Sequence, residues 1–393
     1  MFKVVQINTF PNKATGSIMF SIHNRLVKEG IDSYVVWGRG GKMPVSDHEM
    51  SIKSDWETKV HGAMSRMFDN TGHYSVGATK RLLERLEYVM PDIIHLHNIH
   101  GYYINIDMLF QWIKYRNIPV VWTFHDCWPF TGHCSYFDFV GCEKWQHGCH
   151  DCEQTRTYPA SLLYDNSKNN WLHKKNLFHY DFLNIVTPSE WLRKIVGKSF
   201  FHDVPCSVIH NGINTEIFKP SDNKEKRGKF RILGVASEWT PRKGLNDFIR
   251  LRKMLSEDCA EMVVVGLDEK QKSSLPPGII GLKRTDNIEE LVKLYQNSDL
   301  FFNPTYEDNY PTTNLEALAC GTPVCTYATG GSLECVNNDN GFVLQKGDVG
   351  GVKLLLERYQ FKEKMGMHIN VNISELSEQT MASKYVQLYN TII

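Results

Sequence analysis

The chain has 393 residues, which is more than one ordinary core holds and predicts two domains of roughly 150–200 residues each. It carries 44 basic and 44 acidic side chains, and this balance disfavours binding to nucleic acid or to anionic lipid. The start of the chain lacks a signal-peptide pattern and no run of about 18 apolar residues occurs, so we expect a soluble, cytoplasmic protein without stable disulfides.

The first half of the chain alternates short apolar runs with helical patterns. Amphipathic stretches at 18–30 and 104–117 predict helices. The apolar runs predict strands at 3–8, 32–38, 92–98, 118–125 and 182–189. Alternation of this kind is typical of parallel strands joined by crossover helices. Strands this apolar are expected to be covered by helices on both faces.

Residues 210–230 are polar and rich in turn formers, which predicts a linker. A second α/β series follows, with strands expected at 231–237, 261–266, 278–285, 299–305, 322–328 and 341–345 and a helix at 377–393. We therefore expect an N-terminal domain at 1–209 with a cysteine-rich loop at 127–152, a C-terminal domain at 231–375, and a segment at 376–393 packing back on the first domain. The predicted fold class is α/β: two Rossmann-like, doubly wound domains that face each other across a cleft and bind ligands beyond the carboxyl ends of the strands.

Polar residues follow the predicted strands of the first half. Gly16 opens a helix after the first strand, where backbone N–H groups can approach an anion. His97 and Asn98 end the run "HLHN", and His125 and Asp126 follow "VVWTF". A histidine in such a place is either a polar anchor or acid–base group, or a structural residue satisfied by nearby backbone. His97, Asn98 and Asp126 are candidates for the acceptor side of a site.

The second half places charged residues after its own strands. Arg242 and Lys243 stand at a strand-to-helix turn, where two cations suit a diphosphate, although a solvated basic pair would look the same. The chain contains neither G-x-x-x-x-G-K-[ST] nor G-x-G-x-x-G, which disfavours NTP hydrolysis and ordinary dinucleotide binding.

A carboxylate pair follows the strand at 299–305. Asp308 and Glu316 are eight positions apart, a spacing that lets both face one cleft and bind sugar and ribose hydroxyls. Thr312 and Thr313 between them mark a helix start with unbonded N–H groups that suits a nucleotide.

Four cysteines, Cys134, Cys142, Cys149 and Cys152, form the pattern C-x7-C-x6-C-x2-C. We predict a closed structural zinc site that braces a loop on the acceptor side; packed thiols, disulfides or an iron–sulfur cluster are the alternatives. The aromatic residues of this segment either stack on sugar faces or form a core: Trp128, Tyr136, Phe137 and Trp145. The other five cysteines are expected to be small buried hydrophobes: Cys206, Cys259, Cys320, Cys325 and Cys335.

Taken together, these motifs resemble one family. The carboxylate pair followed by "EALACGTPV", with "RKG", "ATGGSLE" and "NGFVLQKGD" in the same order, looks like retaining GT-B glycosyltransferases of family 4. "ATGSI", "VWGRG", "HLHNIHG" and "HDCWPFTGHC" resemble capsular and exopolysaccharide glycosyltransferases of group 1. The resemblance implies transfer of a sugar from a nucleotide sugar to a glycan or lipid-linked oligosaccharide in surface polysaccharide biosynthesis. UDP is the first choice for the nucleotide that carries the sugar, and GDP is the second. It implies front-face attack and no catalytic metal.

The resemblance also implies residue roles. Glu316 would bind the ribose, and Asp308 would contact the donor sugar at a position where the family usually has Glu, with Glu307 as a competitor. Lys243 would bind the diphosphate, and His125 would contact the donor sugar from the opposite domain.

Further implied contacts involve backbone and neighbouring charge. Gly16 would offer an N–H near the phosphate or the acceptor. Glu238 replaces a family arginine, so Arg242 would supply the second positive charge, and Pro311 removes one backbone donor.

Two other functions fit parts of the sequence. A nucleotide-sugar epimerase or a phosphorylase would use the same fold, and a zinc-dependent binding module would bind no nucleotide sugar. The basic, aromatic stretch 168–180 could contact the inner face of a membrane peripherally, although a solvated helix face explains it better.

Overall fold

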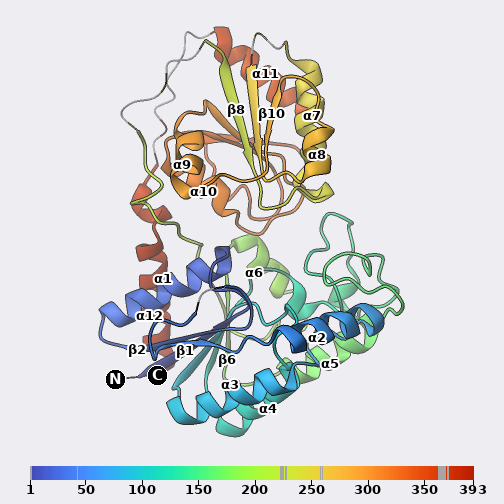
Figure 1. Cartoon of the computed structure of the whole chain (residues 1–393), viewed down its shortest axis with the longest axis vertical. Coiled ribbons are helices and arrows are strands. Elements are labelled where there is room, and N and C mark those ends of the chain that lie inside the picture. Colours follow the sequence, from blue (N-terminus) through green and yellow to red (C-terminus); the bar gives the residue numbers. More distant parts are fainter. Residues whose placement is uncertain are drawn as a thin grey trace. The chain divides into compact units, whose positions relative to one another are not determined.

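The chain divides into two units. The computed structural model describes residues 2–41, 43–221, 225, 228–256, 258, 260–361, 369 and 371–393. Unit 1 comprises Met1–His210 and Met381–Ile393, and unit 2 comprises Asn211–Thr380 (Figure 1). Ile213 and Phe218, from the segment expected to be a linker, pack in an apolar cluster of unit 2. Residues 222–224, 226 and 227 of that segment lie outside the described residues.

Unit 1 is built on a parallel sheet. Within its described part, seven strands are ordered β3-β2-β1-β4-β5-β6-β7. They are β1 Lys3–Asn8, β2 Asp32–Trp37, β3 Glu49–Ser51, β4 Ile93–Leu96, β5 Val120–Thr123, β6 Leu183–Thr187 and β7 Cys206–Val208. All five strands predicted for this half are present. The sequence did not predict β3 and β7, which have three residues each and stand at the two edges of the sheet.

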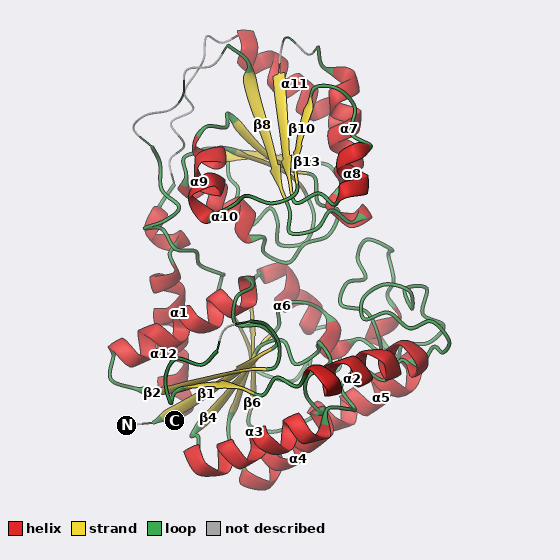
Figure 2. Cartoon of the chain, viewed as in Figure 1, coloured by secondary structure: helices red, strands yellow, loops and turns green. Residues whose placement is uncertain are grey.

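Helices cover both faces of this sheet. Alternate residues of one strand face opposite sides, so Val4 packs with α1 and α12 while Val5 packs with α3 and α4 (Figures 1 and 2). The helices are α1 Ala14–Lys28, α2 Asp55–Phe68, α3 Val76–Val89, α4 Ile106–Arg116, α5 Ser167–Phe178, α6 Glu190–Val196 and α12 Glu378–Ile392, with short 3₁₀ turns at Trp128–Phe130 and Lys144–Gln146. From Met381 onward α12 belongs to unit 1, where Tyr385 and Tyr389 are buried.

Unit 2 repeats this plan. Within its described residues, six parallel strands are ordered β10-β9-β8-β11-β12-β13, all at positions predicted from sequence. They are β8 Phe230–Val235, β9 Ala260–Val265, β10 Ile279–Leu282, β11 Leu300–Asn303, β12 Val324–Tyr327 and β13 Gly341–Leu344. The helices are α7 Leu245–Met254, α8 Glu269–Ser273, α9 Ile288–Gln296, α10 Thr312–Ala319 and α11 Val349–Phe361, with 3₁₀ turns at Pro241–Lys243 and Ile373–Leu376. Helices α7 and α11 pack on one face, and α9 and α10 on the other.

The strand orders locate the sites where ligands bind. In both sheets the order reverses beside the first strand of the unit, between β1 and β4 and between β8 and β11. Ligands of doubly wound sheets bind outside the carboxyl ends of the strands at such a reversal. The segments that follow these four strands carry most of the candidate residues. None of the helices in the described part of the chain is long and apolar enough to cross a membrane.

Candidate active site

The basic turn after β8 has a backbone that only glycine allows. Lys243 ends a 3₁₀ turn, and Gly244 follows it with φ = 78°. A Cβ at Gly244 would lie 2.1 Å from the carbonyl oxygen of Pro304. The turn is fastened to the segment after β11 because the Tyr306 N–H donates to the Arg242 carbonyl at 2.7 Å. The "RKG" turn is therefore held at the switch point of unit 2.

This contact brings Lys243 to Asp308. The Lys243 ammonium forms an ion pair with the buried Asp308 carboxylate. Arg242 Nη1 donates to the Glu307 carbonyl at 2.6 Å. Burial acts to raise the pKa of Asp308, but the charges of Lys243 and Arg242 outweigh it and hold the pKa below its ordinary value. Lys243 and Asp308, 65 positions apart in sequence, thus form one charged cluster with Arg242.

A third segment closes on the same carboxylate-bearing residue. Gly330 has φ = 53°, and a Cβ there would lie 1.9 Å from the Asp308 carbonyl oxygen. The Gly331 N–H donates to that oxygen at 3.1 Å. The "ATGG" turn after β12 thus packs directly on Asp308, as expected if these motifs serve one site.

Glu316 lies further along, on α10. It is partly buried, and the Tyr295 hydroxyl from α9 donates to its Oε2 at 2.9 Å. Burial raises the pKa of Glu316 above its ordinary value, although the hydrogen bonds from Tyr295 and Thr312 act to lower it. Thr313 is partly buried in the first turn of α10. This carboxylate lies on α10 and is held by α9.

In unit 1, two candidate histidines pair at the ends of β4 and β5. His97 Nδ1 lies 3.0 Å from His125 Nε2, and the rings stack with an interplanar angle of 13°. His97 Nε2 lies 3.3 Å from Gln6 Oε1. His97 is buried and His125 is partly exposed. Burial lowers the pKa of His125 to about 4, so the ring is neutral near pH 7.

Asp126 has a partner that sequence reasoning missed. Its Oδ2 lies 2.8 Å from His100 Nε2, and its Oδ1 accepts the Trp128 N–H at 2.9 Å. Burial acts to raise the pKa of Asp126, but the charge and hydrogen bond of His100 outweigh it and hold the pKa below its ordinary value. His100 stands in "HLHNIHG", where a third histidine was the available signal. Both oxygens of Asp126 are used within the protein, so it positions neighbours.

The C-terminal helix reaches the same strand ends. The Tyr389 hydroxyl lies 2.6 Å from His95 Nδ1, and the Tyr385 hydroxyl lies 2.9 Å from Thr123 Oγ1. His95 Nε2 lies 2.8 Å from Thr123 Oγ1. Both nitrogens of His95 are therefore engaged, and this histidine is a structural one. The sequence offered no signal for these tyrosines.

The remaining unit 1 candidates lie near β1. Gly16 is buried in the first turn of α1. The Asn98 N–H donates to Asn8 Oδ1 at 3.3 Å, and the Asn98 carbonyl accepts Thr9 Oγ1–H at 2.8 Å. The backbones that follow β1 and β4 are thus joined at the switch point.

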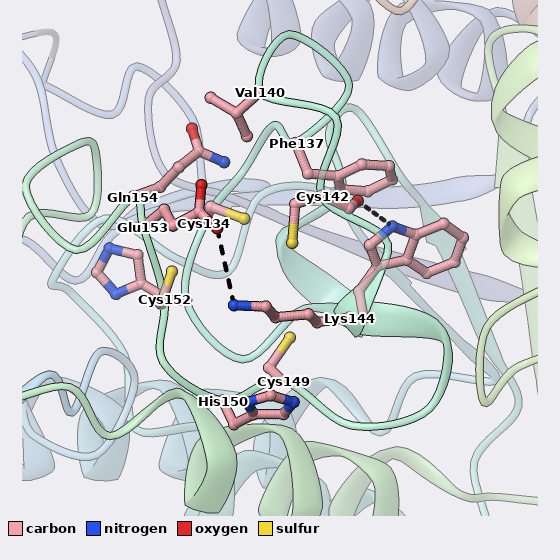
Figure 3. Close-up of a pocket in the computed structure, with 12 residues that line it drawn as sticks. Cys134, Phe137, Val140, Cys142, Lys144, Cys149, His150, Cys152, Glu153 and Gln154 are labelled. Atoms are coloured by element: carbon pink, nitrogen blue, oxygen red, sulfur yellow. Dashed lines mark hydrogen bonds and ion pairs between the residues drawn. The ribbon is translucent and has the colours of Figure 1, made fainter.

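The four clustered cysteines line one cavity together with Lys144 and His150 (Figure 3). Burial raises the pKa of Cys149 to about 11 and that of Cys152 to about 12. Tetrahedral zinc sites place thiolate sulfurs about 3.8 Å apart. Among the described residues, the one group of three His, Cys, Asp or Glu ligands within 4.8 Å of one another lies elsewhere. No three of the four sulfurs therefore lie within 4.8 Å of one another.

One histidine beside these cysteines has an unsatisfied nitrogen. His133 Nδ1 lies 2.5 Å from Asp69 Oδ1, and its buried Nε2 has no hydrogen-bond partner. Its side chain lines the cavity of the cysteines. A histidine held by a carboxylate with its other nitrogen bare is typical of metal ligands.

The aromatic residues of this segment are mostly core. Trp128, Phe137 and Trp145 are between 1% and 4% exposed, and the rings of Phe137 and Trp145 stack at 4.7 Å. Only Tyr136 of the four is partly exposed. Stacking on sugar faces is therefore wrong for the three buried rings. They pack beneath the loop because the segment has few aliphatic residues to fill that space.

The scattered cysteines differ in burial. Cys320 and Cys325 are fully buried in apolar clusters of unit 2. Cys206 and Cys335 are partly buried against such clusters. Cys259 lies outside the described residues.

Comparison with known proteins identifies the family. The model of Glycosyltransferase Family 4 matches residues 16–217, and that of Glycosyl transferases group 1 matches residues 216–367. The chain belongs to glycosyltransferase family 4. It is an enzyme of the glycosyltransferase class with the GT-B fold of two Rossmann-like domains.

Relatives of this glycosyltransferase carry names of polysaccharide biosynthesis enzymes. WcaC of Escherichia coli (strain K12), named as a colanic acid biosynthesis glycosyl transferase, is 24% identical over 95% of this chain and 96% of its own. CapM of Staphylococcus aureus, a capsular polysaccharide biosynthesis glycosyltransferase, is 24% identical over 53% of this chain and 62% of its own. The structure of Anabaena Alr3699/HepE in complex with UDP and glucose is 15% identical, covers 99% of this chain and 100% of that chain, and has a TM-score of 0.63.

Proposed function

We propose that this glycosyltransferase transfers a sugar from a UDP-sugar to a glycan or lipid-linked oligosaccharide, with retention of anomeric configuration. The observation that carries the proposal is the cluster of Lys243, Arg242 and Asp308 at the switch point of unit 2. Two cations beside one carboxylate suit a diphosphate joined to a sugar. The UDP bound to HepE supports uracil as the base.

The leaving group determines the role of the cations. As the bond between the anomeric carbon and the diphosphate oxygen breaks, negative charge grows on that oxygen. Lys243 and Arg242 lie in a partly buried site, where preorganised charge stabilises such an oxyanion far better than water does. In the unliganded protein Asp308 neutralises Lys243. Donor binding would release the ammonium to the diphosphate and the carboxylate to a sugar hydroxyl.

We infer front-face attack for the transfer itself. The acceptor oxygen bonds to the anomeric carbon on the face from which the diphosphate departs. The acceptor hydroxyl proton passes to a diphosphate oxygen, so UDP leaves with the proton and no protein carboxylate forms a covalent intermediate. Glu316, with Thr312 and Thr313 at the start of the same helix, is proposed to bind the nucleoside and phosphate.

The acceptor side is proposed for unit 1. His125 is neutral and partly exposed, so it can hydrogen-bond a sugar hydroxyl without adding charge. His97 orients it, while Asn98 and the N–H of Gly16 are proposed to contact the acceptor or the phosphate. Asp126 acts through His100 and the Trp128 backbone.

Peripheral contact with the inner membrane face remains an additional proposal, in keeping with a lipid-linked acceptor. In the stretch 168–180, Lys174 is buried beneath Trp128, so the cationic surface there consists of Lys168, Lys175 and their neighbours.

Binding of nucleotide sugars tests the proposed function. We expect UDP-sugars to raise the melting temperature more than GDP-, ADP- or CMP-sugars at equal concentration, because a ligand that binds only the folded state stabilises it. Glu316→Gln is expected to lower the apparent affinity for UDP-sugars about tenfold. This is about the contribution of one hydrogen bond to a charged group. No shift with any nucleotide sugar would overturn the proposal. Conversion of the donor sugar without acceptor would indicate an epimerase instead.

A structural zinc ion at the cysteines is a separate proposal. The thiolates of Cys134, Cys142, Cys149 and Cys152 would bind it in a closed tetrahedral site that braces the loop, and the bare Nε2 of His133 lines the same cavity. The sulfurs would have to move closer together on binding.

Elemental analysis checks this zinc. Protein purified without added metal is expected to hold about one zinc per chain through mild chelation, as thiolate zinc sites do. The double variant Cys149→Ser/Cys152→Ser should hold about one zinc per chain fewer than the parent, and Cys206→Ser, outside the cluster, should hold as much as the parent. Less than a tenth of an equivalent in the parent protein would reject the zinc.

A further inference from the structure

Three metal-ligating side chains meet away from the cysteines. His73 follows α2, Asp107 opens α4, and His173 lies on α5. His73 Nδ1 lies 2.8 Å from Asp107 Oδ2, and His173 Nε2 lies 2.6 Å from Asp107 Oδ1. All three ligand atoms lie within 4.8 Å of one another, which no other such group among the described residues achieves. Each histidine thus uses a different oxygen of the same carboxylate.

The backbone holds His73 against α4 without help from these side chains. The Ile106 N–H donates to the Gly72 carbonyl at 2.8 Å. Asn105 Nδ2 donates to the His73 carbonyl at 2.6 Å, and Asn105 Oδ1 caps α4. The residue before the helix therefore fixes both the loop that carries His73 and the turn that carries Asp107.

A second set of contacts fixes α5 to the same loop. The Asn166 N–H donates to Asp69 Oδ2 at 3.0 Å, and Asn170 Nδ2 donates to the Asp69 carbonyl at 2.5 Å. Asn166, Asn170 and His173 are spaced i, i+4 and i+7, so they share one helix face. His173 is consequently directed at the loop by contacts one and two turns earlier. The three ligands are preorganised on rigid backbone.

The donor set suits a borderline divalent metal. Two imidazoles and one carboxylate bind zinc and related ions such as Co²⁺. The side chains of His73, Asp107 and His173 are 27%, 27% and 40% exposed, which lets water reach a fourth position. Burial acts to raise the pKa of Asp107, but the hydrogen bonds and charges of the two histidines hold it below its ordinary value, so the carboxylate is ionised near pH 7.

We propose that His73, Asp107 and His173 bind a zinc ion that ties the loop after α2 to α4 and α5. The ion binds the two ring nitrogens that now face the carboxylate, and each histidine then binds as a neutral imidazole whose single proton sits on its other ring nitrogen. Next to His173, Lys174 Nζ donates to the carbonyls of Trp128 and Thr131 at 2.8 and 3.0 Å. The ion would therefore hold the helix that supports the cysteine-rich segment. This site does not depend on the proposed transferase activity.

Titration of the metal-free full chain with Co²⁺ tests the site. Thiolate-bound cobalt has intense charge-transfer absorption in the near ultraviolet, whereas a histidine–carboxylate site has only weak visible bands. We expect one equivalent of the second kind in the parent protein. Asp107→Asn and His173→Gln should each weaken it by at least about 10–100-fold, the loss that even indirect changes at metal sites cause. His202→Gln, an exposed histidine outside the group, should bind as the parent does.

Zinc-dependent stability gives a second readout. At zinc 100-fold above its dissociation constant the melting temperature of the parent should rise by about 5–10 °C. Asp107→Asn should show a smaller zinc-dependent rise than the parent, because only the cysteine site is left to bind the ion. Equal cobalt uptake and equal zinc shifts in the parent and in both ligand variants would overturn the proposal, because the bound metal would then lie elsewhere.

Discussion

Replacing Lys243 by alanine is expected to lower the transfer rate about 100–1000-fold. This is the loss seen when a single preorganised donor to a developing oxyanion is removed. Lys243 carries the charge nearest to Asp308, and it is held there by a turn that only glycine at 244 allows. The measurement is kcat for sugar transfer at saturating donor and acceptor. Lys253→Ala, an exposed lysine on α7, is the matched control and should leave kcat unchanged.

A structural role for Lys243 can be separated from this one. Alanine at 243 leaves the buried Asp308 charge unpaired, which costs about 3–5 kcal/mol of stability. The double variant Lys243→Ala/Asp308→Asn removes that charge as well, so its unfolding free energy should recover. Its kcat should stay low. Recovery of kcat together with stability would show that Lys243 only neutralises Asp308, contrary to the role proposed for it.

Unit 1 is expected to lose stability steeply in acid. Burial lowers the pKa of His23 to about 4 and that of His61 to about 3, against about 6.5 in the unfolded chain. Above pH 6.5 both states are neutral and stability is complete. Below it the unfolded state binds protons that the folded state refuses, so the unfolding free energy falls as pH falls toward 4. Each histidine contributes about 1.4 kcal/mol per pH unit, and the two together about 3.

Urea denaturation at a series of pH values between 7.5 and 4.5 measures this slope. His23 Nδ1 lies 2.9 Å from Ser33 Oγ, a neutral partner. His23→Gln removes the titrating ring and should therefore reduce the slope of the unfolding free energy against pH by about 1.4 kcal/mol per pH unit. This holds however much unfolding free energy the variant loses at pH 7.5. His202→Gln should keep the parent slope. An unchanged slope in His23→Gln would mean that His23 is protonated equally in both states.

The fold could be predicted almost entirely from sequence. Parallel strands covered on both faces need unbroken apolar runs, and every such run proved to be a strand, as at β1 and β11. The short edge strands β3 and β7 were not predicted, because three half-exposed residues are too few to show an alternating apolar pattern. The sequence predicts that the C-terminal segment returns to the first domain from 376, whereas in the structure unit 1 takes up α12 from Met381, and the tyrosines of this helix contact β4.

The candidate site was only partly predictable. Residues after β8 and β11 were found because strand ends at a switch point collect ligand contacts. The roles of Lys243, Asp308 and Glu316 remain predictions, although the structure does pair the first two. His100 was missed because its partner Asp126 is 26 positions away. The role of the aromatic residues of the cysteine-rich segment could not be predicted. A buried core ring and an exposed sugar-binding ring are the same residue types in the sequence.

By itself, the sequence determined the two parallel sheets, the order of the motifs and which residue types follow each strand. These properties are local, because they follow from side-chain periodicity and turn chemistry over about ten residues. The tertiary structure alone decided which polar groups meet. His73, Asp107 and His173 are separated by 34 and 66 positions, and only the packing of α4 and α5 on one loop brings them together. The four cysteines lie closer together in sequence, yet no three of their sulfurs come within the same 4.8 Å.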